Sequence, residues 1–479
     1  MKITKQQSIQ HLFWRAGFGA TPALIQRERH RPIKKIVRDL LHDKNPFLPL
    51  TAGENKPFAD RKALRSMVRD GMMNRTLLKE KIRQDTEHIR DLNVRWVETM
   101  ASGRDVLREK MALFWHGHFA CRVRNPDAIQ QYLNTIRQHA LGKFSDLLMA
   151  VSKEPAMLQF LNNQQNRKNA PNENFAREVM ELFTLGRDNY TENDIKDAAR
   201  AFTGWGFDAE GGFLFRKNQH DDGPKTIFGQ TGNFSGEDVI RLLLEKKQTA
   251  RFVTGKIYRF LVDDQTADAN TNARIDLLAN RFYTSGYDIA DLLESILTAD
   301  WFYNPAHIGT RIKSPVELLA GMQHMLNITF EQKQSILFIQ RTLGQVLLYP
   351  PSVAGWPGGR NWIDSSSLLF RMQLPNVLLQ AGQVSVRQKE DGDVNTEGLV
   401  RRGNGTLNAT VSWTPFEEAF AKVSTDKLPD VLAEYLLQQP LGQTQRTLVM
   451  QHTRPDSTHS EQIRSLTAAI MSLPEYQLC

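Results

Sequence analysis

The chain has 479 residues, of which 41% are hydrophobic and 24% are charged, and its formal net charge is +8. This length suits about two or three domains or one large helical body, and the composition excludes disorder throughout the chain. The two cysteines, Cys121 and Cys479, exclude a disulfide framework and a cysteine-rich zinc site. Two cysteines fit a protein of a reducing compartment, but they do not establish that location.

The positive charge bears on partners and on location. Much of it lies at 61–95 among Asp and Glu residues, a pattern more typical of a solvated helix face than of nucleic-acid binding. We therefore expect an anionic substrate or an acidic partner protein, and no specific nucleic acid. No apolar run approaches the ~20 residues that span a bilayer. The start Met1-Lys2-Ile3-Thr4-Lys5 also lacks the apolar core of a signal peptide, so we expect no transmembrane segment and a cytoplasmic location.

Residues that typically begin and end helices occur along much of the chain. Thr21 and Pro22 form an N-cap and a first-turn proline, and Thr191 with Asp194 forms a capping box. The polar, charged and proline-free stretch at 60–100 predicts a long helix or helical pair. Further helices are predicted at 106–119, 127–141, 144–152, 174–185, 192–202, 238–261, 272–283, 289–298, 315–325, 415–437 and 460–473.

Two stretches break the helical pattern. Residues 204–236 combine alternating aromatics with a cluster of turn residues, which predicts a small β-hairpin. Residues 384–412 are polar and rich in Gly, Asn and Asp. We expect a mainly α fold, a multi-helix globular body with a small β-hairpin excursion near 206–230. Its helical core would span 1–383, a polar linker or exposed excursion 384–414, and a C-terminal helical segment packing on the core 415–479.

The strongest candidate for chemistry is the predicted helix at 174–185, closed by Gly186. Asn174, Glu178 and Glu181 share a side of this helix away from its apolar stripe. Two carboxylates on one face can share a divalent cation such as Mg²⁺, Mn²⁺ or Ca²⁺. The structural alternative, favoured by spacing alone, is a solvated face with an ion pair between Arg177 and Glu181.

The second candidate is the Trp115–Phe119 segment. A continuous helix places His116 and His118 on opposite sides, whereas a helix that ends at Gly117 would let both converge on a metal such as zinc. Histidines flanked by Trp and Phe are more often packed and hydrogen-bonded residues than metal ligands.

Two further motifs are weaker. The turn with His220, Asp221 and Lys225 offers acid, base and cation, although turns commonly have this composition anyway. The glycine-rich stretch at 355–367, which contains Arg360, precedes a helix start that can bind an anion through free backbone N–H groups. It lacks both the Walker pattern and the dinucleotide-binding pattern, and a structural aromatic loop is the more common case.

Several of these segments resemble one bacterial family, known only as domain of unknown function 1800. The resemblance lies at 11–19, 115–120, 171–205, 220–229, 313–315 and 350–361, and it extends from near residue 10 to about residue 380. It implies a largely helical fold and no stated activity. Members of this family are often exported and encoded beside a second uncharacterised family that resembles alkaline phosphatases and sulfatases. The family's polar motif positions fall on His116, His118, Asn174, Arg177, Glu178, Glu181, His220, Asp221 and Lys225.

Two hypotheses follow. The first is a metal-dependent hydrolase or group-transfer enzyme acting on an anionic substrate, whose divalent metal (Mg, Mn, Ca or Zn) is held by Glu178 and Glu181 with Asn174 or His118. His220 or Asp221 would act as acid or base, and Arg177 and Lys225 would neutralise substrate charge. The alternative is a non-catalytic binding or assembly protein that partners a phosphatase- or sulfatase-like protein.

Overall fold

The computed structural model describes residues 3–42, 45–52, 75–264, 268–379, 407–454 and 456–479. Within these ranges α-helices predominate and strands occur as short antiparallel pairs, which confirms the expected mainly helical fold. None of the helices described combines the length and the apolar character that crossing a bilayer needs.

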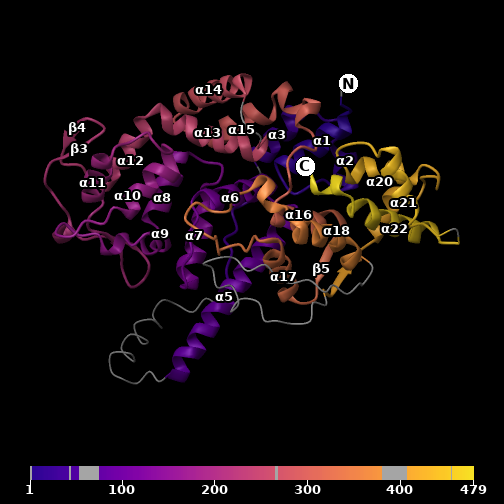
Figure 1. The fold of residues 1–479 in the computed structure, drawn as a ribbon, viewed down its shortest axis with the longest axis horizontal. Helices are drawn as coiled ribbons and strands as arrows, with labels where there is room; N and C mark the ends of the chain where they lie inside the picture. The colour runs from indigo at the N-terminus through magenta and orange to yellow at the C-terminus, as the bar shows by residue number, and fades with distance from the viewer. Residues whose placement is uncertain (1–2, 43–44, 53–74, 265–267, 380–406, 455) are drawn as a thin grey trace.

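The N-terminal third places its most buried helix at the centre of the molecule. Helix α6 is buried on almost every side, as expected of a helix that other helices surround. It packs against α3, α5 and α7, and Figure 1 shows α5 projecting away from this centre. The helices of this third are α1 (Lys5–Arg15), α2 (Pro22–Glu28), α3 (Ile33–Leu41), α5 (Arg75–Ala101), α6 (Val106–His118), α7 (Pro126–His139), α8 (Phe144–Lys153) and α9 (Pro155–Phe160).

The middle third forms one end of the molecule and a layer along one side, where α13, α14 and α15 run beside α3 (Figure 1). Its helices are α10 (Asn174–Glu178), α11 (Glu192–Ala201), α12 (Gly236–Glu245), α13 (Lys247–Leu261), α14 (Ala269–Thr284) and α15 (Ile289–Leu297). The single helix predicted at 238–261 is wrong, because Lys246 adopts an extended backbone that separates α12 from α13. The Thr249 hydroxyl donates to the Leu243 carbonyl across this break.

The predicted hairpin region holds two hairpins instead of one. Strand β1 (Trp205–Phe207) pairs with β2 (Phe213–Phe215), and β3 (Lys225–Ile227) pairs with β4 (Gln230–Gly232). Phe228 and Gly229 both have positive φ between β3 and β4, as tight two-residue hairpin turns require. The second hairpin packs on α11 at the far end of the molecule (Figure 1).

The C-terminal third completes the core. Its elements are α16 (Pro315–Leu326), β5 (Ile328–Phe330), α17 (Lys333–Leu343), α18 (Ser365–Leu379), β6 (Ala409–Val411), α19 (Thr414–Phe420), α20 (Leu428–Leu436), α21 (Gln443–Met450) and α22 (His459–Met471). Strand β6 lies inside the stretch predicted to be a linker and pairs with β5. The boundary predicted at residue 383 lies outside the described residues. The chain end returns to the core, where Lys313 N donates to Gln477 O.

Candidate functional site

The segment at 174–185 is not the continuous α-helix that its spacing predicts. Helix α10 ends at Glu178 and continues as a π-helical turn, η2 (Val179–Thr184), in which Leu185 N donates to the Met180 carbonyl, five residues back. Such turns shift side chains from their α-helical positions and are frequent near functional sites. Gly186, predicted to end the segment, has the left-handed φ of +79°.

The charged side chains of this segment have other partners than the sequence suggests. Arg177 binds Glu192 of α11 through two hydrogen bonds of 2.8 and 2.7 Å, and the Arg177–Glu181 ion pair is therefore wrong. Glu181 accepts from Tyr190 at 2.5 Å and from Arg187 at 2.7 Å, and these contacts lower its pKa. Burial and the nearby Glu181 raise the pKa of Glu178. Asn174 lies exposed at the start of α10.

The two histidines of α6 are buried and contact different neighbours. The helix runs through Gly117 to His118, so the two rings do not converge. His116 Nε2 accepts from Leu348 N at 3.0 Å, and burial lowers the pKa of His116 to about 3. His118 Nε2 lies 3.1 Å from the Phe183 carbonyl of the π-helical turn, and burial together with Lys256 lowers the pKa of His118.

The His220–Lys225 turn forms a compact polar network. His220 Nδ1 lies 2.9 Å from the Thr203 carbonyl, and Lys225 Nζ donates to the Asp221 carbonyl at 2.5 Å. The Asp221 carboxylate accepts from Arg200 at 2.7 Å, which lowers the pKa of Asp221. These contacts join the turn to α11, and each is of the kind that stabilises a turn.

The family motif residues are therefore distributed among several local networks. Within the described part of the chain, no group of three or more His, Cys, Asp or Glu side chains is placed to hold a metal ion. Of the residues predicted to form a site, His118 lies in the wall of a substantial pocket, next to Phe114 and Gly117 of the same helix.

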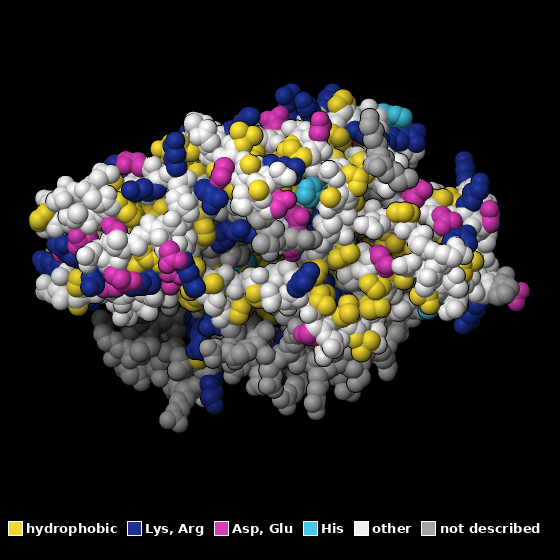
Figure 2. Space-filling view, turned by 45° about the horizontal axis from the view of Figure 1, so that its top comes forward, with side chains coloured by type: hydrophobic (Ala, Val, Ile, Leu, Met, Phe, Trp, Pro, Cys, Tyr) yellow, Lys and Arg dark blue, Asp and Glu magenta, His cyan; other side chains and the backbone are white. Residues whose placement is uncertain are grey.

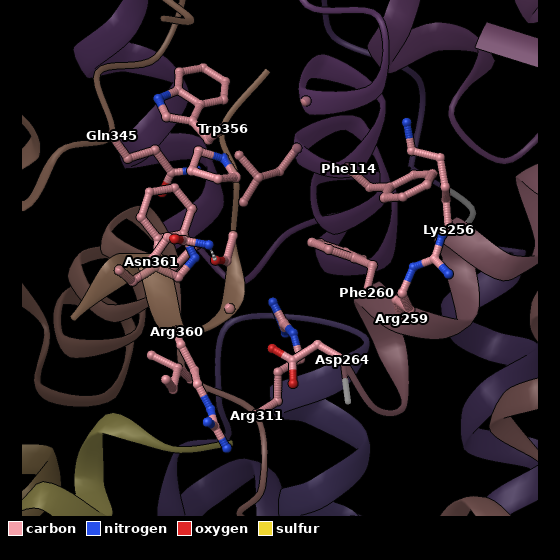
Figure 3. A pocket seen from close by; sticks show the side chains of 18 of the residues that line it. Phe114, Lys256, Arg259, Phe260, Asp264, Arg311, Gln345, Trp356, Arg360 and Asn361 are labelled. Atoms are coloured by element: carbon pink, nitrogen blue, oxygen red, sulfur yellow. Dashed lines mark hydrogen bonds between the residues drawn. The ribbon is translucent and has the colours of Figure 1, made fainter. Parts of the chain in front are cut away.

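This pocket has a volume of about 750 Å³, within the range of sites for small organic ligands. Its walls come from α6, from α13 and the residues after it, from the segment just before α16, and from the glycine-rich loop at 354–362 (Figure 3). The lining residues are Leu113, Phe114, Gly117, His118, Lys256, Arg259, Phe260, Asp264, Arg311, Ile312, Ser314, Gln345, Ala354, Trp356, Pro357, Gly358, Gly359, Arg360, Asn361 and Trp362.

The charge of the pocket is strongly positive, with four cationic side chains and one carboxylate, Asp264, in its lining. The side chains of Lys256, Arg259 and Arg360 make no hydrogen bond or ion pair with another described residue, although the Lys256 ammonium lies 5.3 Å from the centre of the Phe252 ring. Burial, and to a lesser extent Arg259, lower the pKa of Lys256 to about 8. Cations without counter-ions in a recess attract anions more strongly than cations on an open surface do.

The glycine-rich loop is held against α6 by a close backbone contact. Gly355 has a φ of +77°, and a Cβ atom at this position would lie 2.3 Å from the Gly117 carbonyl oxygen. Only glycine allows the loop to approach so closely. Trp356 then lies with its ring centroid 5.4 Å from that of His116, and the loop continues to Arg360 as one wall of the pocket.

A buried ionic network lies behind the pocket and fixes Arg311. Glu317 of α16 accepts two hydrogen bonds from Arg311 Nη2, at 2.8 and 2.9 Å, and one from Lys110 of α6. Lys110 Nζ also donates to the carbonyls of Trp14 and Gly17, both at 3.0 Å. Burial acts to raise the pKa of Glu317, but Arg311 and Lys110 lower it to about 2. The network joins α1, α6 and α16 beneath the pocket.

Sequence reasoning identified the loop with Arg360 but missed Lys256 and Arg259. A signal for them exists, because α13 carries Lys and Arg residues and no acidic residue. Its Lys256 and Arg259 lie one turn apart and face the same way. Figure 2 shows acidic and basic side chains interspersed over the visible face, but α1 and α17 also lack acidic residues, so the composition of α13 alone does not place Lys256 and Arg259 in a pocket.

These observations define a helical protein with a cationic, partly aromatic pocket formed by segments far apart in the sequence. The chain belongs to the family described as "Protein of unknown function (DUF1800)", whose model matches residues 11–478. The match therefore includes the C-terminal region beyond residue 380, where the motif resemblance ended. No curated protein and no solved structure matches the chain.

Proposed function

We propose that the protein binds a small anionic ligand in the pocket between α6, α13 and the glycine-rich loop. The observation that carries this proposal is the set of cations Lys256, Arg259 and Arg360, which line the pocket without a counter-ion among the described residues. Phe114, Phe260 and Trp356 add an aromatic surface for the apolar part of such a ligand.

Lys256→Met is expected to weaken the binding of an aromatic sulfonate such as naphthalene-2-sulfonate by about 10- to 100-fold. This corresponds to the ~1.5–3 kcal/mol of a hydrogen bond to a charged group. Isothermal titration calorimetry measures the dissociation constant directly. Lys422→Met, at an exposed position, is the matched control and should leave binding unchanged. Equal affinities for the two variants would contradict the proposal.

The affinity is also expected to depend on pH in one direction. The Lys256 amine is protonated below its pKa of about 8 and neutral above it, so affinity should fall as pH rises from 7 to 10. The sulfonate keeps its charge over this range. Lys256→Arg retains a permanent cation and should abolish the fall between pH 7 and 10. A wild-type affinity that stays constant over this range would count against the role of Lys256.

A second candidate function is metal-dependent hydrolysis or group transfer at Glu178 and Glu181. It is favoured by Glu178, whose half-buried carboxylate makes no hydrogen bond or ion pair with another described residue. A divalent cation would relieve the repulsion between the two carboxylates. The other hypothesis, an assembly protein that partners a phosphatase- or sulfatase-like protein, stays a prediction.

If this second candidate is correct, gently purified protein carries near-stoichiometric Mg, Mn, Ca or Zn, and the Glu178→Ala/Glu181→Ala variant carries none. Inductively coupled plasma mass spectrometry measures the metal, and circular dichroism verifies that the variant is folded. Metal-free wild-type protein, together with a double variant that melts at a lower temperature, would assign both carboxylates a structural role.

A further inference from the structure

The cations of the pocket lie on two separate walls. Figure 3 shows Lys256 and Arg259 beside Phe260 on one side, and Arg360 with Trp356 and Asn361 on the other. Lys256 and Arg259 belong to one face of α13, whereas Arg360 belongs to the short helical turn η6 (Gly359–Trp362) of the glycine-rich loop.

Both walls are available to a ligand, unlike the floor between them. Arg311 lies on the floor and is already held by both carboxylate oxygens of Glu317. Asp264 is the one carboxylate in the lining, and its Oδ2 would lie 3.1 Å from a Cβ atom on Gly359. The floor is therefore close to electrically balanced, and the unpaired positive charge is concentrated at the two walls.

The size of the pocket favours an organic ligand over a single inorganic anion. A volume of about 750 Å³ suits an organic molecule, and one acidic group cannot neutralise cations on opposite walls at the same time. A ligand with one acidic group would therefore leave the cation on the other wall without a counter-ion.

We propose that the natural ligand carries two acidic groups joined by a flat or apolar segment. One acidic group binds Lys256 and Arg259, the other binds Arg360, and the joining segment lies against Trp356 and Phe260. This inference rests on the proposed function, because it assigns the ligand class of the same pocket.

Matched pairs of aromatic sulfonates test this inference by calorimetry on the full-length protein. The pairs are benzenesulfonate and benzene-1,3-disulfonate, naphthalene-2-sulfonate and naphthalene-2,6-disulfonate, and biphenyl-4-sulfonate and biphenyl-4,4′-disulfonate, which differ in the spacing of the acidic groups. For at least one pair we expect the disulfonate to bind 10-fold or more tightly than the monosulfonate.

The variants Lys256→Met and Arg360→Met separate the two walls. Arg360→Met should reduce disulfonate affinity to the level of the monosulfonate and change monosulfonate affinity by no more than a few fold, because the monosulfonate binds at Lys256 and Arg259. Lys256→Met should weaken the binding of both ligands. Asp264→Asn should strengthen disulfonate binding, because it removes the negative charge beside Gly359. Lys422→Met should change neither affinity.

The possible outcomes are distinguishable. Monosulfonates and disulfonates that bind equally in all pairs would overturn the two-acid ligand and leave the anionic pocket standing. Full disulfonate affinity in Arg360→Met would also overturn it. A failure of every sulfonate to bind would overturn the proposed function itself.

Discussion

Replacing Glu317 with glutamine is expected to lower the free energy of unfolding by ~3–5 kcal/mol, the usual cost of leaving buried charges without their partner. Lys110 and Arg311 would lose their shared carboxylate in a region that is almost fully buried. Glutamine retains the shape of the side chain and suits the capping box that Glu317 forms with Ser314, so the loss reports the charge. Chemical denaturation monitored by circular dichroism measures it.

A surface pair supplies the control for this experiment. Glu417→Gln breaks the contact with Arg464, whose side chain is 48% exposed, and should cost no more than ~1 kcal/mol. Acid denaturation adds a second readout. The pKa of Glu317 is lowered from 4.5 to about 2 in the folded state. The charged carboxylate therefore stabilises the fold fully above pH 4.5, and this stabilisation is lost as the pH falls toward 2. Glu317→Gln should remove this part of the acid sensitivity. If Glu317→Gln and Glu417→Gln lowered the free energy of unfolding equally, the stabilising role of the buried network would be refuted.

Gly355→Ala is expected to cost ~2–5 kcal/mol and to abolish sulfonate binding. The left-handed backbone contributes ~1–2 kcal/mol for a residue with a Cβ atom, and the forced separation from Gly117 contributes ~1–3 kcal/mol. The loop must move away from α6 because both contacting atoms belong to the backbone or are bonded directly to it. Denaturation and calorimetry with naphthalene-2-sulfonate measure the two effects.

Gly286→Ala isolates the contribution of backbone conformation. Gly286 has a comparable φ of +69°, but no atom lies within 4 Å of its added Cβ, and it does not line the pocket. This variant should lose ~1–2 kcal/mol and retain full binding. If Gly355→Ala behaved in the same way, the close approach to Gly117 would have no role in forming the pocket.

Local features were predictable because they depend on neighbouring residues. The capping box of Thr191 with Asp194 and the N-cap of Thr21 are in place, and the residues involved are at most three positions apart. The mainly helical fold and the family follow from such short segments. The break at Lys246 escaped prediction because the apolar pattern runs on through it and no Gly or Pro marks it.

Side-chain partners were less predictable from spacing. Arg177 and Glu181 stand at a favourable helical separation, yet Arg177 reaches Glu192 on the neighbouring helix and Glu181 binds Tyr190. The π-helical turn between them changes which faces they occupy. Pairing depends on distances between helices, and spacing within one helix does not contain that information.

The sequence by itself determined the helical class, the principal caps and the family, and it singled out the glycine-rich loop only as one of the weaker candidates. Only the tertiary structure decided that Lys256 and Arg360 line one pocket, that His118 lies in its wall, and that Arg311 is occupied by Glu317. The physical reason is that helix formation is governed by contacts within a few residues. The electrostatics of a pocket, in contrast, depend on which distant side chains packing brings together and which of them it leaves without a counter-ion.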